Sequence, residues 1–333
     1  MTNIVGRTAL ALLLAASAMA AHAANDRIRI MVGGIEKQIY LPAILAQLLG
    51  YFKEQGLDVE LLTEPSGVHA EDELLAGSVH GVVGFYDHTI DLQAKGKFVQ
   101  SVVQFAQAPG EAELVATRHA GEINTPADFK GRSLGVTGLG SSTHFLTNYL
   151  AIVNGVKPGE IKLRAVGSGA TFVAAMRQHV IDAGMTTEPT ISQLLKSGES
   201  KIMVDLRTPQ STQKVLGGLY PAACLYMTSV WINTHKPQVQ KLANALVKTL
   251  KYIDTHTPEQ IAAELPSEYH VGERAMYVEA LRASKSMFTV DGRMPASGPE
   301  TVLKVLKVAN RLVKGKTIDL SKTFATEFVD AAR

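Results

Sequence analysis

Cysteine is almost absent from this chain, because the 333 residues contain only one, Cys224. A single cysteine cannot form a disulfide within the chain, so the fold must be held together by burial of apolar side chains. Cys224 lies in an apolar stretch, residues 221–227, which predicts a small, buried, hydrophobic side chain. A reactive thiol is the alternative interpretation of this residue.

An excess of charge and the signatures of catalysis are absent as well. The 33 basic and 31 acidic side chains give a formal net charge of +2, which gives no reason to expect nucleic acid or an anionic membrane as a partner. The sequence has no phosphate-binding Walker loop, no Gly-x-Ser-x-Gly turn and no cysteine–histidine pair. Its histidines lack the spacing of metal ligands. We therefore expect a protein that is not an enzyme and that holds no metal or cofactor.

Long apolar runs are confined to the N-terminus. Arg7 precedes an apolar run, residues 8–21, and Ala21-His22-Ala23 then supplies the small residues of a cleavage site. A permanent membrane anchor needs about 20 apolar residues, so an uncleaved anchor is the weaker alternative. We expect residues 1–23 to be a cleaved signal peptide. The mature protein would be free in the periplasm, because no nearby cysteine is available for a lipid anchor.

The order of short apolar segments predicts two lobes. Removing 23 of the 333 residues leaves 310, which exceeds the size of about 250–300 residues at which a single core stops growing. Strand-like and helix-like segments alternate, which is typical of an α/β fold with mostly parallel sheets flanked by helices. We expect lobe one to comprise residues 24–118 plus 222–333, and lobe two residues 119–221. Two chain crossings, near 118–119 and 217–221, would allow hinge closure over a ligand cleft.

Several short motifs occur in an order that resembles one known family. They are Gly50-Tyr-Phe-Lys-Glu-Gln-Gly-Leu-Asp-Val-Glu60, Leu75-Ala-Gly77, Asp128-Phe-Lys-Gly131, Gly140-Ser-Ser-Thr143 and Ala183-Gly184 with Glu188-Pro189. Together they resemble the NMT1/SsuA/THI5-like periplasmic binding proteins of nitrate, sulfonate, taurine and thiamine-precursor importers. The resemblance implies a two-lobed, type II periplasmic-binding-protein fold and a monomer, with an ABC permease and its ATPase as partners. The chain departs from the family pattern at His80 and His179, both at helix–strand turns.

The best candidate site is the motif Gly140-Ser141-Ser142-Thr143, which follows a predicted strand and begins a predicted helix. The first amide groups of a helix have no partner one turn back, and the helix dipole places partial positive charge there. Small hydroxyl side chains add donors without blocking access. These features predict a pocket for a carboxylate, sulfonate or phosphate group. An ordinary serine cap without a ligand is the alternative.

Residues near the ends of other strands complete the expected ligand-binding site. They are Gly34, Gln38, Tyr40, Gly67, Phe85, Tyr86, Thr187 and Glu188. Glycine lets backbone approach a ligand closely, and an aromatic ring can stack on a flat ligand, although a plain turn and core packing are the alternatives. Glu188 could accept from a ligand amine, or it could stabilise the start of its own helix.

These observations predict a periplasmic solute-binding component of an ABC importer that captures a small organic anion, a sulfonate or a carboxylate. The alternatives are a binder of a pyrimidine or thiamine precursor and a ligand-sensing subunit. An enzyme of the pyrimidine-synthase kind shares the expected fold. That group carries a cysteine-rich stretch, however, whereas this chain has a single cysteine.

Overall fold

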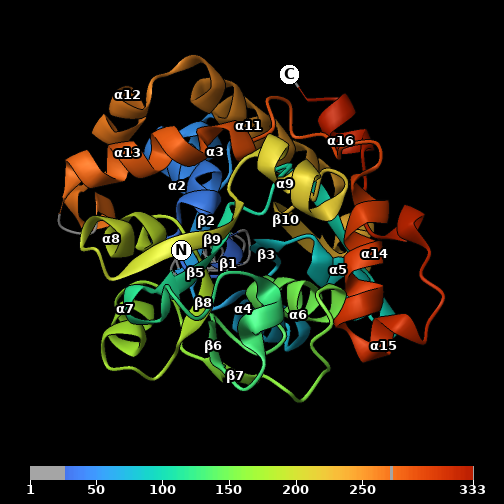
Figure 1. Ribbon diagram of the computed structural model, residues 1–333. Coiled ribbons are helices and arrows are strands. Elements are labelled where there is room, and N and C mark those ends of the chain that lie inside the picture. The colour runs from blue at the N-terminus through green and yellow to red at the C-terminus, as the bar shows by residue number, and fades with distance from the viewer. Residues whose placement is uncertain (1–26, 271–272, 333) are drawn as a thin grey trace, which may run out of the picture.

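The computed structural model describes residues 27–270 and 273–332, which form two lobes (Figure 1). The first lobe is built on a five-stranded sheet in the order β2-β1-β3-β10-β4. Its strands are β1 (Ile28–Val32), β2 (Val59–Thr63), β3 (Gly81–Phe85), β4 (Val99–Gln104) and β10 (Ala223–Thr228). Strand β10 runs antiparallel to both of its neighbours, whereas β1 pairs in parallel with β2 and β3.

The second lobe repeats this arrangement with a sheet in the order β7-β6-β8-β5-β9. Its strands are β5 (Glu111–Ala116), β6 (Ser133–Val136), β7 (Lys162–Ala165), β8 (Ala183–Thr187) and β9 (Ser200–Leu206). Here β5 is the antiparallel strand, between β8 and β9. The predicted two-lobed α/β class is confirmed, with two mixed sheets of five strands each.

Strand β5 corrects the sequence-based boundary between the lobes. We placed residues up to 118 in lobe one, but β5 pairs with strands of the second sheet, so the chain crosses before Glu111. All six residues of β5 are buried, yet Glu111 and Glu113 interrupt its apolar pattern. Buried acids in a short segment conceal a strand from a search for apolar runs. Strand β10 ends at Thr228, and α10 (Ser229–Thr234) begins directly after it.

Helices cover both faces of each sheet (Figure 1). In the first lobe they are η1 (Gln38–Tyr40), α2 (Leu41–Leu48), α3 (Tyr51–Glu54), α4 (Gly67–Leu75) and α5 (Asp87–Ala94). Between β5 and β10 they are η2 (Thr117–His119), η3 (Pro126–Phe129), α6 (Ser142–Val153), α7 (Ala170–Arg177), α8 (Thr190–Lys196) and α9 (Pro209–Leu216). The C-terminal part is helical: α10 (Ser229–Thr234), α11 (Lys236–Thr255), α12 (Pro258–Ala263), η4 (Ser267–His270), α13 (Arg274–Ser284), η5 (Lys285–Met287), α14 (Gly298–Ala309), α15 (Arg311–Lys314), η6 (Leu320–Lys322) and α16 (Glu327–Asp330). None of the helices in the described residues is long and apolar enough to cross a membrane.

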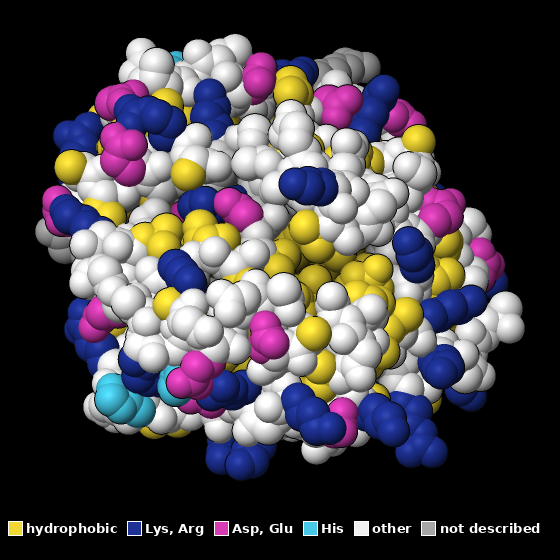
Figure 2. Space-filling view, viewed as in Figure 1, with side chains coloured by type: hydrophobic (Ala, Val, Ile, Leu, Met, Phe, Trp, Pro, Cys, Tyr) yellow, Lys and Arg dark blue, Asp and Glu magenta, His cyan; other side chains and the backbone are white. Residues whose placement is uncertain are grey.

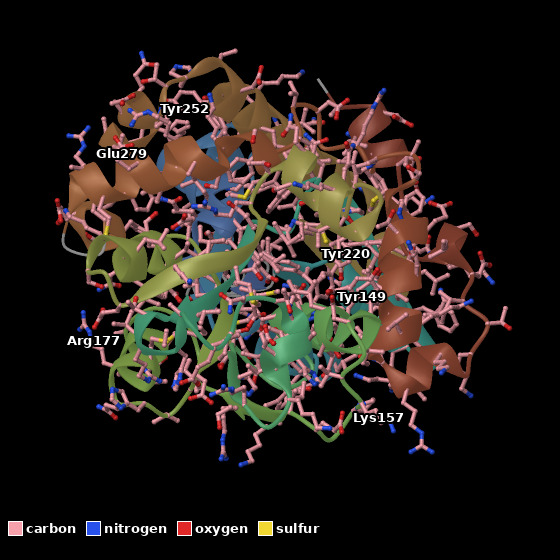
Figure 3. All side chains as sticks on the ribbon, viewed as in Figure 1. Tyr149, Lys157, Arg177, Tyr220, Tyr252 and Glu279 are labelled. Atoms are coloured by element: carbon pink, nitrogen blue, oxygen red, sulfur yellow. The ribbon has the colours of Figure 1, made fainter. Side chains whose placement is uncertain are left out.

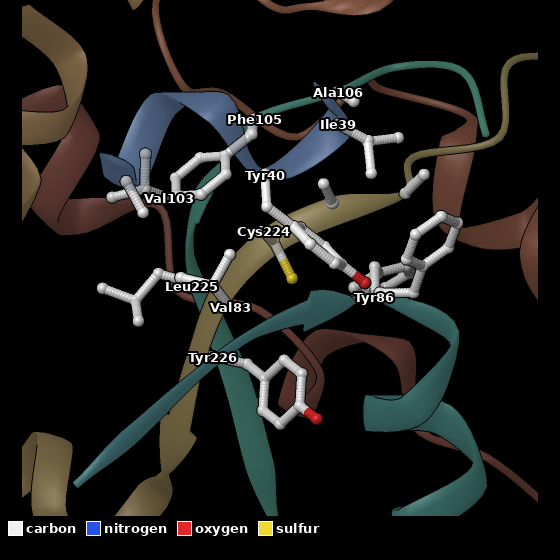
Figure 4. Packing of buried hydrophobic residues seen from close by; sticks show 14 of the residues in the cluster. Ile39, Tyr40, Val83, Tyr86, Val103, Phe105, Ala106, Cys224, Leu225 and Tyr226 are labelled. Atoms are coloured by element: carbon white, nitrogen blue, oxygen red, sulfur yellow. The ribbon is translucent and has the colours of Figure 1, made fainter. Parts of the chain in front are cut away.

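The centre of the first sheet forms the main hydrophobic core (Figure 4). Val83, Val103 and Leu225 pack there with the fully buried Cys224. Burial raises the pKa of the Cys224 thiol, so little reactive thiolate forms. This single cysteine therefore packs as a small hydrophobic residue, one of the two interpretations that its sequence context left open.

The two lobes are closed on one another. The Gln38 amide donates to the Glu188 carbonyl oxygen at 3.0 Å, and the Ser168 hydroxyl donates to Glu36 at 2.6 Å. Helix α6 of the second lobe packs against α14, and the main hydrophobic cluster continues from the first lobe to Phe145 on α6. In Figure 2, hydrophobic side chains gather near the centre of the viewed face, between α9 and α6, and charges of both signs surround them. The predicted signal peptide, residues 1–23, lies outside the described residues.

Candidate functional site

A small cavity lies where the carboxyl ends of the parallel strands in the two sheets face one another. Its walls are Lys37, Tyr40, Gly67, Phe85, His88, Glu111, Thr137, Ser141, Ser142, Thr143 and Thr187. In the closed arrangement these walls leave space for about one water molecule. Ligands of open α/β folds bind at this edge of the sheet, which makes the cavity the candidate site.

The start of α6 forms the hydrogen-bond-donor side of the cavity. Ser141 is the N-cap, in an extended conformation, and Ser142 begins the helix. Both hydroxyls are buried, and neither makes a hydrogen bond of normal geometry within the described residues. Thr143 instead fixes the preceding loop, since its hydroxyl oxygen accepts from the Thr137 amide at 3.0 Å. Two hydroxyls without a normal hydrogen bond therefore lie beside the positive end of the α6 dipole, and that of Ser142 is close to Asp87 and Tyr220.

A second helix start meets the cavity from the first lobe. Ser66 precedes α4, and Gly67 lines the cavity at its first residue. A Cβ atom at Gly67 would lie 2.8 Å from His88 Cε1, and one at Gly33 would lie 2.8 Å from Gly67 Cα. Glycine is therefore required at both positions, because backbone and imidazole ring approach one another too closely for a side chain.

Lys37 supplies a buried cation that the sequence analysis missed. Its side chain is buried, its Nζ donates to the Gly33 carbonyl oxygen at 2.5 Å, and burial lowers its pKa. A Cβ atom at Gly34 would collide with this side chain, so Gly34 leaves space for Lys37 and is not itself part of the wall. The Gly33-Gly34 pair was the available signal, but a lysine in the loop beyond a strand is expected to be exposed.

Two buried acids come from opposite lobes: Glu111 lines the cavity, and Asp87 directly precedes the lining residue His88. Glu111 begins β5, is 1% exposed, and its Oε2 has no hydrogen-bond partner in the described residues. Asp87 begins α5 and is fully buried; its Oδ2 accepts from the Tyr220 hydroxyl at 2.9 Å. Burial raises the pKa of both carboxyls, and the Asp87 charge further raises that of Glu111. Figure 3 shows Tyr220 toward the middle of the molecule and Arg177 at its edge.

His88 was also missed, and a charged network holds its ring in the wall. Its Nδ1 lies 3.3 Å from the Tyr226 hydroxyl and 3.5 Å from a Glu71 carboxylate oxygen. Its Nε2 lies 3.9 Å from Asp87, too far for a hydrogen bond. The sequence signal was its place just after β3, where we singled out only the two aromatic residues before it.

Seven of the eleven predicted site residues line the cavity: Tyr40, Gly67, Phe85, Ser141, Ser142, Thr143 and Thr187. The Tyr40 and Phe85 rings pack edge to face, 6.2 Å apart. Contact of these residues with a ligand stays a prediction.

Three other predicted residues have partners elsewhere, as does Gly34 beside Lys37. The Gln38 side chain donates to the Tyr277 carbonyl oxygen at 2.9 Å, and the Tyr86 hydroxyl pairs with that of Thr323 at 2.5 Å. Glu188 accepts from Arg207 at 2.8 Å and from the Ser192 amide at 2.9 Å. The structure thus gives Glu188 the second of its two predicted roles, at the start of its own helix.

Residues suited to a metal ion are not gathered together in residues 27–270 and 273–332. No group of three or more histidine, cysteine, aspartate or glutamate side chains there could hold a metal. The site combines hydroxyl and amide donors, one lysine and two carboxyls. Such a lining can bind a small polar molecule that carries an acidic group.

The sequence matches the family described as NMT1/THI5 like over residues 39–261, more than half of the chain. The protein belongs to the NMT1/THI5-like family. A curated relative is a 4-amino-5-hydroxymethyl-2-methylpyrimidine phosphate synthase of Saccharomyces cerevisiae, 29% identical over 165 residues. The match covers 49% of this chain and 47% of the relative, so the chain spans about half the length of the curated relatives it matches.

Solved structures share the fold over most of its length. A protein of Bordetella bronchiseptica has a TM-score of 0.88 and 34% identity, covering 92% of this chain and 96% of that one. A ligand-binding component of an ABC-type import system from Staphylococcus aureus has a TM-score of 0.72 and 14% identity, covering 92% and 99%. The periplasmic aliphatic sulphonate-binding protein of Escherichia coli has a TM-score of 0.67 and 21% identity, also covering 92% and 99%. The predicted type II periplasmic-binding-protein fold is confirmed.

Proposed function

We propose that this protein is the periplasmic solute-binding component of an ABC importer and that it captures a small organic acid, a sulfonate or a carboxylate. The observation that carries the proposal is the cavity itself. The unpartnered Ser141 and Ser142 hydroxyls, the α6 start and Lys37 converge there. Hydrogen-bond donors at the positive end of a helix favour an acidic group.

The mechanism is capture by closure, without chemical change of the ligand. The two walls of the cavity come from different lobes, so opening about the two crossings would admit the ligand and closure would exclude water. A permease would then recognise the closed form, and a separate ATPase would drive transport. The similarity in fold to importer binding proteins supports these partners.

A thermal-shift screen of the mature chain tests the proposal. We expect a saturable rise in melting temperature with alkane- and arylsulfonates or carboxylates, because a ligand that binds only the folded state stabilises it. Ser142→Leu should remove the shift by filling the donor side of the cavity. Ser229→Leu, at the start of α10 and outside the cavity, is the matched control that should keep it. Shifts that persist in Ser142→Leu would contradict the assignment of the site.

A pyrimidine ligand is the second candidate, favoured by the names of the curated relatives and by the Tyr40 and Phe85 rings in the wall. Aminopyrimidines belong in the same screen, where they should shift melting only if a flat ring fits between the lobes. Synthase activity is the remaining possibility, and formation of a pyrimidine product by the purified chain would reveal it. The burial of Cys224, the one thiol, argues against an exposed reactive cysteine in such chemistry.

A further inference from the structure

We propose that closure of the two lobes takes up a proton at the buried acids Glu111 and Asp87, so that the closed form is favoured at low pH. The inference rests on the proposed function, because it assumes that the lobes open and close over this cavity. It adds a regulatory property to the site: capture of an organic acid would be coupled to the pH around the protein.

The geometry that supports the proposal is the burial of two acids that belong to different lobes. Glu111 belongs to β5 in the second sheet, and Asp87 follows β3 of the first. Both are buried in the closed arrangement, and each has a carboxylate oxygen without a hydrogen-bond partner among the described residues, Oε2 of Glu111 and Oδ1 of Asp87. A buried carboxylate that lacks a donor is costly in its charged form and much less so when protonated.

Groups on every neighbouring element face Glu111. They are Lys37 before η1, Tyr40 in η1, Asp87 in α5, Glu113 on the same strand and Tyr220 before β10. Lys37 is the one cation among them, and its ammonium group already donates to the Gly33 and Pro65 carbonyl oxygens. His88 faces Asp87 but lies nearer to another acid, Glu71. The acids therefore outnumber the cations around the cavity.

The sign of the linkage follows from the change in surroundings. In the closed form burial raises the pKa of Glu111 well above its usual range, and Asp87 raises it further while Lys37 opposes the rise. Opening would return both carboxyls to water, where they ionise near pH 4. Closure therefore binds protons. The closed form is favoured at low pH and loses this advantage as pH rises through the closed-state pKa, by up to about tenfold in the closed-to-open ratio per pH unit.

Glu113 supplies a matched control on the same strand. It is fully buried, its Oε2 accepts from the Thr147 hydroxyl at 2.9 Å, and burial raises its pKa to about 8. Its partner Thr147 belongs to α6, so both groups lie in the second lobe and stay together when the lobes separate. Protonation of Glu113 should affect folding stability but not closure.

The test is the distance between spin labels on the two lobes, measured by pulsed electron paramagnetic resonance from about pH 5 to about pH 8. Lys53→Cys on α3 and Lys157→Cys after α6 are exposed sites for the labels, and the fully buried Cys224 stays unlabelled. We expect the short-distance, closed population to grow as pH falls. Glu111→Gln, which resembles the protonated acid, should keep the closed population high at every pH, and Glu113→Gln should behave as the native chain does.

Two results would overturn the proposal: a native closed population that does not change with pH, or a pH dependence that Glu113→Gln removes and Glu111→Gln does not. Asp87→Asn, which should also weaken the dependence, keeps the test valid if Glu111→Gln fails to fold. The experiment needs no ligand. A screen without a hit alongside a pH-dependent distance would reject the proposed function alone, and a hit alongside an unchanging distance would reject this inference alone.

Discussion

Two buried glutamates at neighbouring strand ends of the second sheet have opposite surroundings. At the junction of β8 and α8, Glu188 is 1% exposed, and both of its carboxylate oxygens have partners, Arg207 and the Ser192 amide. At the start of β5, Glu111 is equally buried, but one of its oxygens has no partner in the described part of the chain. The two residues share residue type, depth and sheet, and they differ in how completely they are hydrogen-bonded.

The comparison separates groups that hold the fold from groups that are available to a ligand. A satisfied buried acid lowers the free energy of the structure only while its partners remain, so it acts as part of the architecture. A buried acid without partners makes folding less favourable, so its presence needs an explanation other than stability. The cavity concentrates such groups, since the Ser141, Ser142 and Thr187 hydroxyls are also buried without partners among the described residues.

Removing a partner at the satisfied junction should have the largest effect. Arg207→Ala would leave the buried Glu188 without its ion pair, and we expect a loss of about 3–5 kcal/mol in the free energy of unfolding, measured by urea denaturation. The exposed pair of Arg177 and Glu199 provides the control, because solvent screens this pair and Arg177→Ala should change the free energy of unfolding little. Equal losses in the two variants would break the distinction between the two kinds of acid.

Two hydroxyl groups at the start of α6 allow the same comparison between a hydrogen-bonded and an unbonded buried group. The expected losses of stability are smaller here. Thr143→Val removes the acceptor of the buried Thr137 amide and should cost about 1–3 kcal/mol. Ser142→Ala removes a hydroxyl that makes no normal hydrogen bond, so its cost in stability should stay within about 0.5 kcal/mol. Melting temperatures of the two variants would check this order, and a costlier Ser142→Ala would show that the cavity hydroxyls support the fold.

Sequence reasoning found the regular parts of this molecule because they depend on local pattern. The start of α6 directly after its N-cap Ser141, within the predicted Gly140-Ser-Ser-Thr143 motif, follows from residue types at fixed spacing. Burial of charge across the lobe boundary has no such signature. Lys37 and Glu111 look like exposed residues in sequence, yet both are buried at the cavity between the lobes.

The orientation of side chains was the second feature that the sequence did not predict. Tyr86 and Phe85 are adjacent at the end of β3, and we expected either ring to face the ligand. Phe85 lines the cavity, whereas Tyr86 follows the strand and bonds with Thr323 in the C-terminal segment. The backbone changes from strand to helical conformation at Tyr86, so position near a strand end predicts the neighbourhood of a site and not its members.

Replacing the unsatisfied acid Glu111 should change the free energy of unfolding least at low pH. At higher pH the replacement should make the protein more stable. Glu111→Gln keeps the shape of the side chain and removes the cost of burying a charge. Since the folded-state pKa of Glu111 is raised, native stability is lost as pH rises from the unfolded-state pKa toward the folded-state one. The variant should match the native chain near pH 4 and then become the more stable, by up to about 1.4 kcal/mol per pH unit in that interval. Urea denaturation at several pH values measures this gain.

Glu113→Gln should show a similar gain up to about pH 8, because burial raises the pKa of Glu113 too. Stability alone therefore groups the two acids of β5 together, and only closure of the lobes should separate them, since the like charge of Asp87 in the other lobe raises the pKa of Glu111 and not that of Glu113. A variant Glu111→Gln less stable than the native chain at high pH would mean that this carboxylate is satisfied after all, and the contrast with Glu188 would fail.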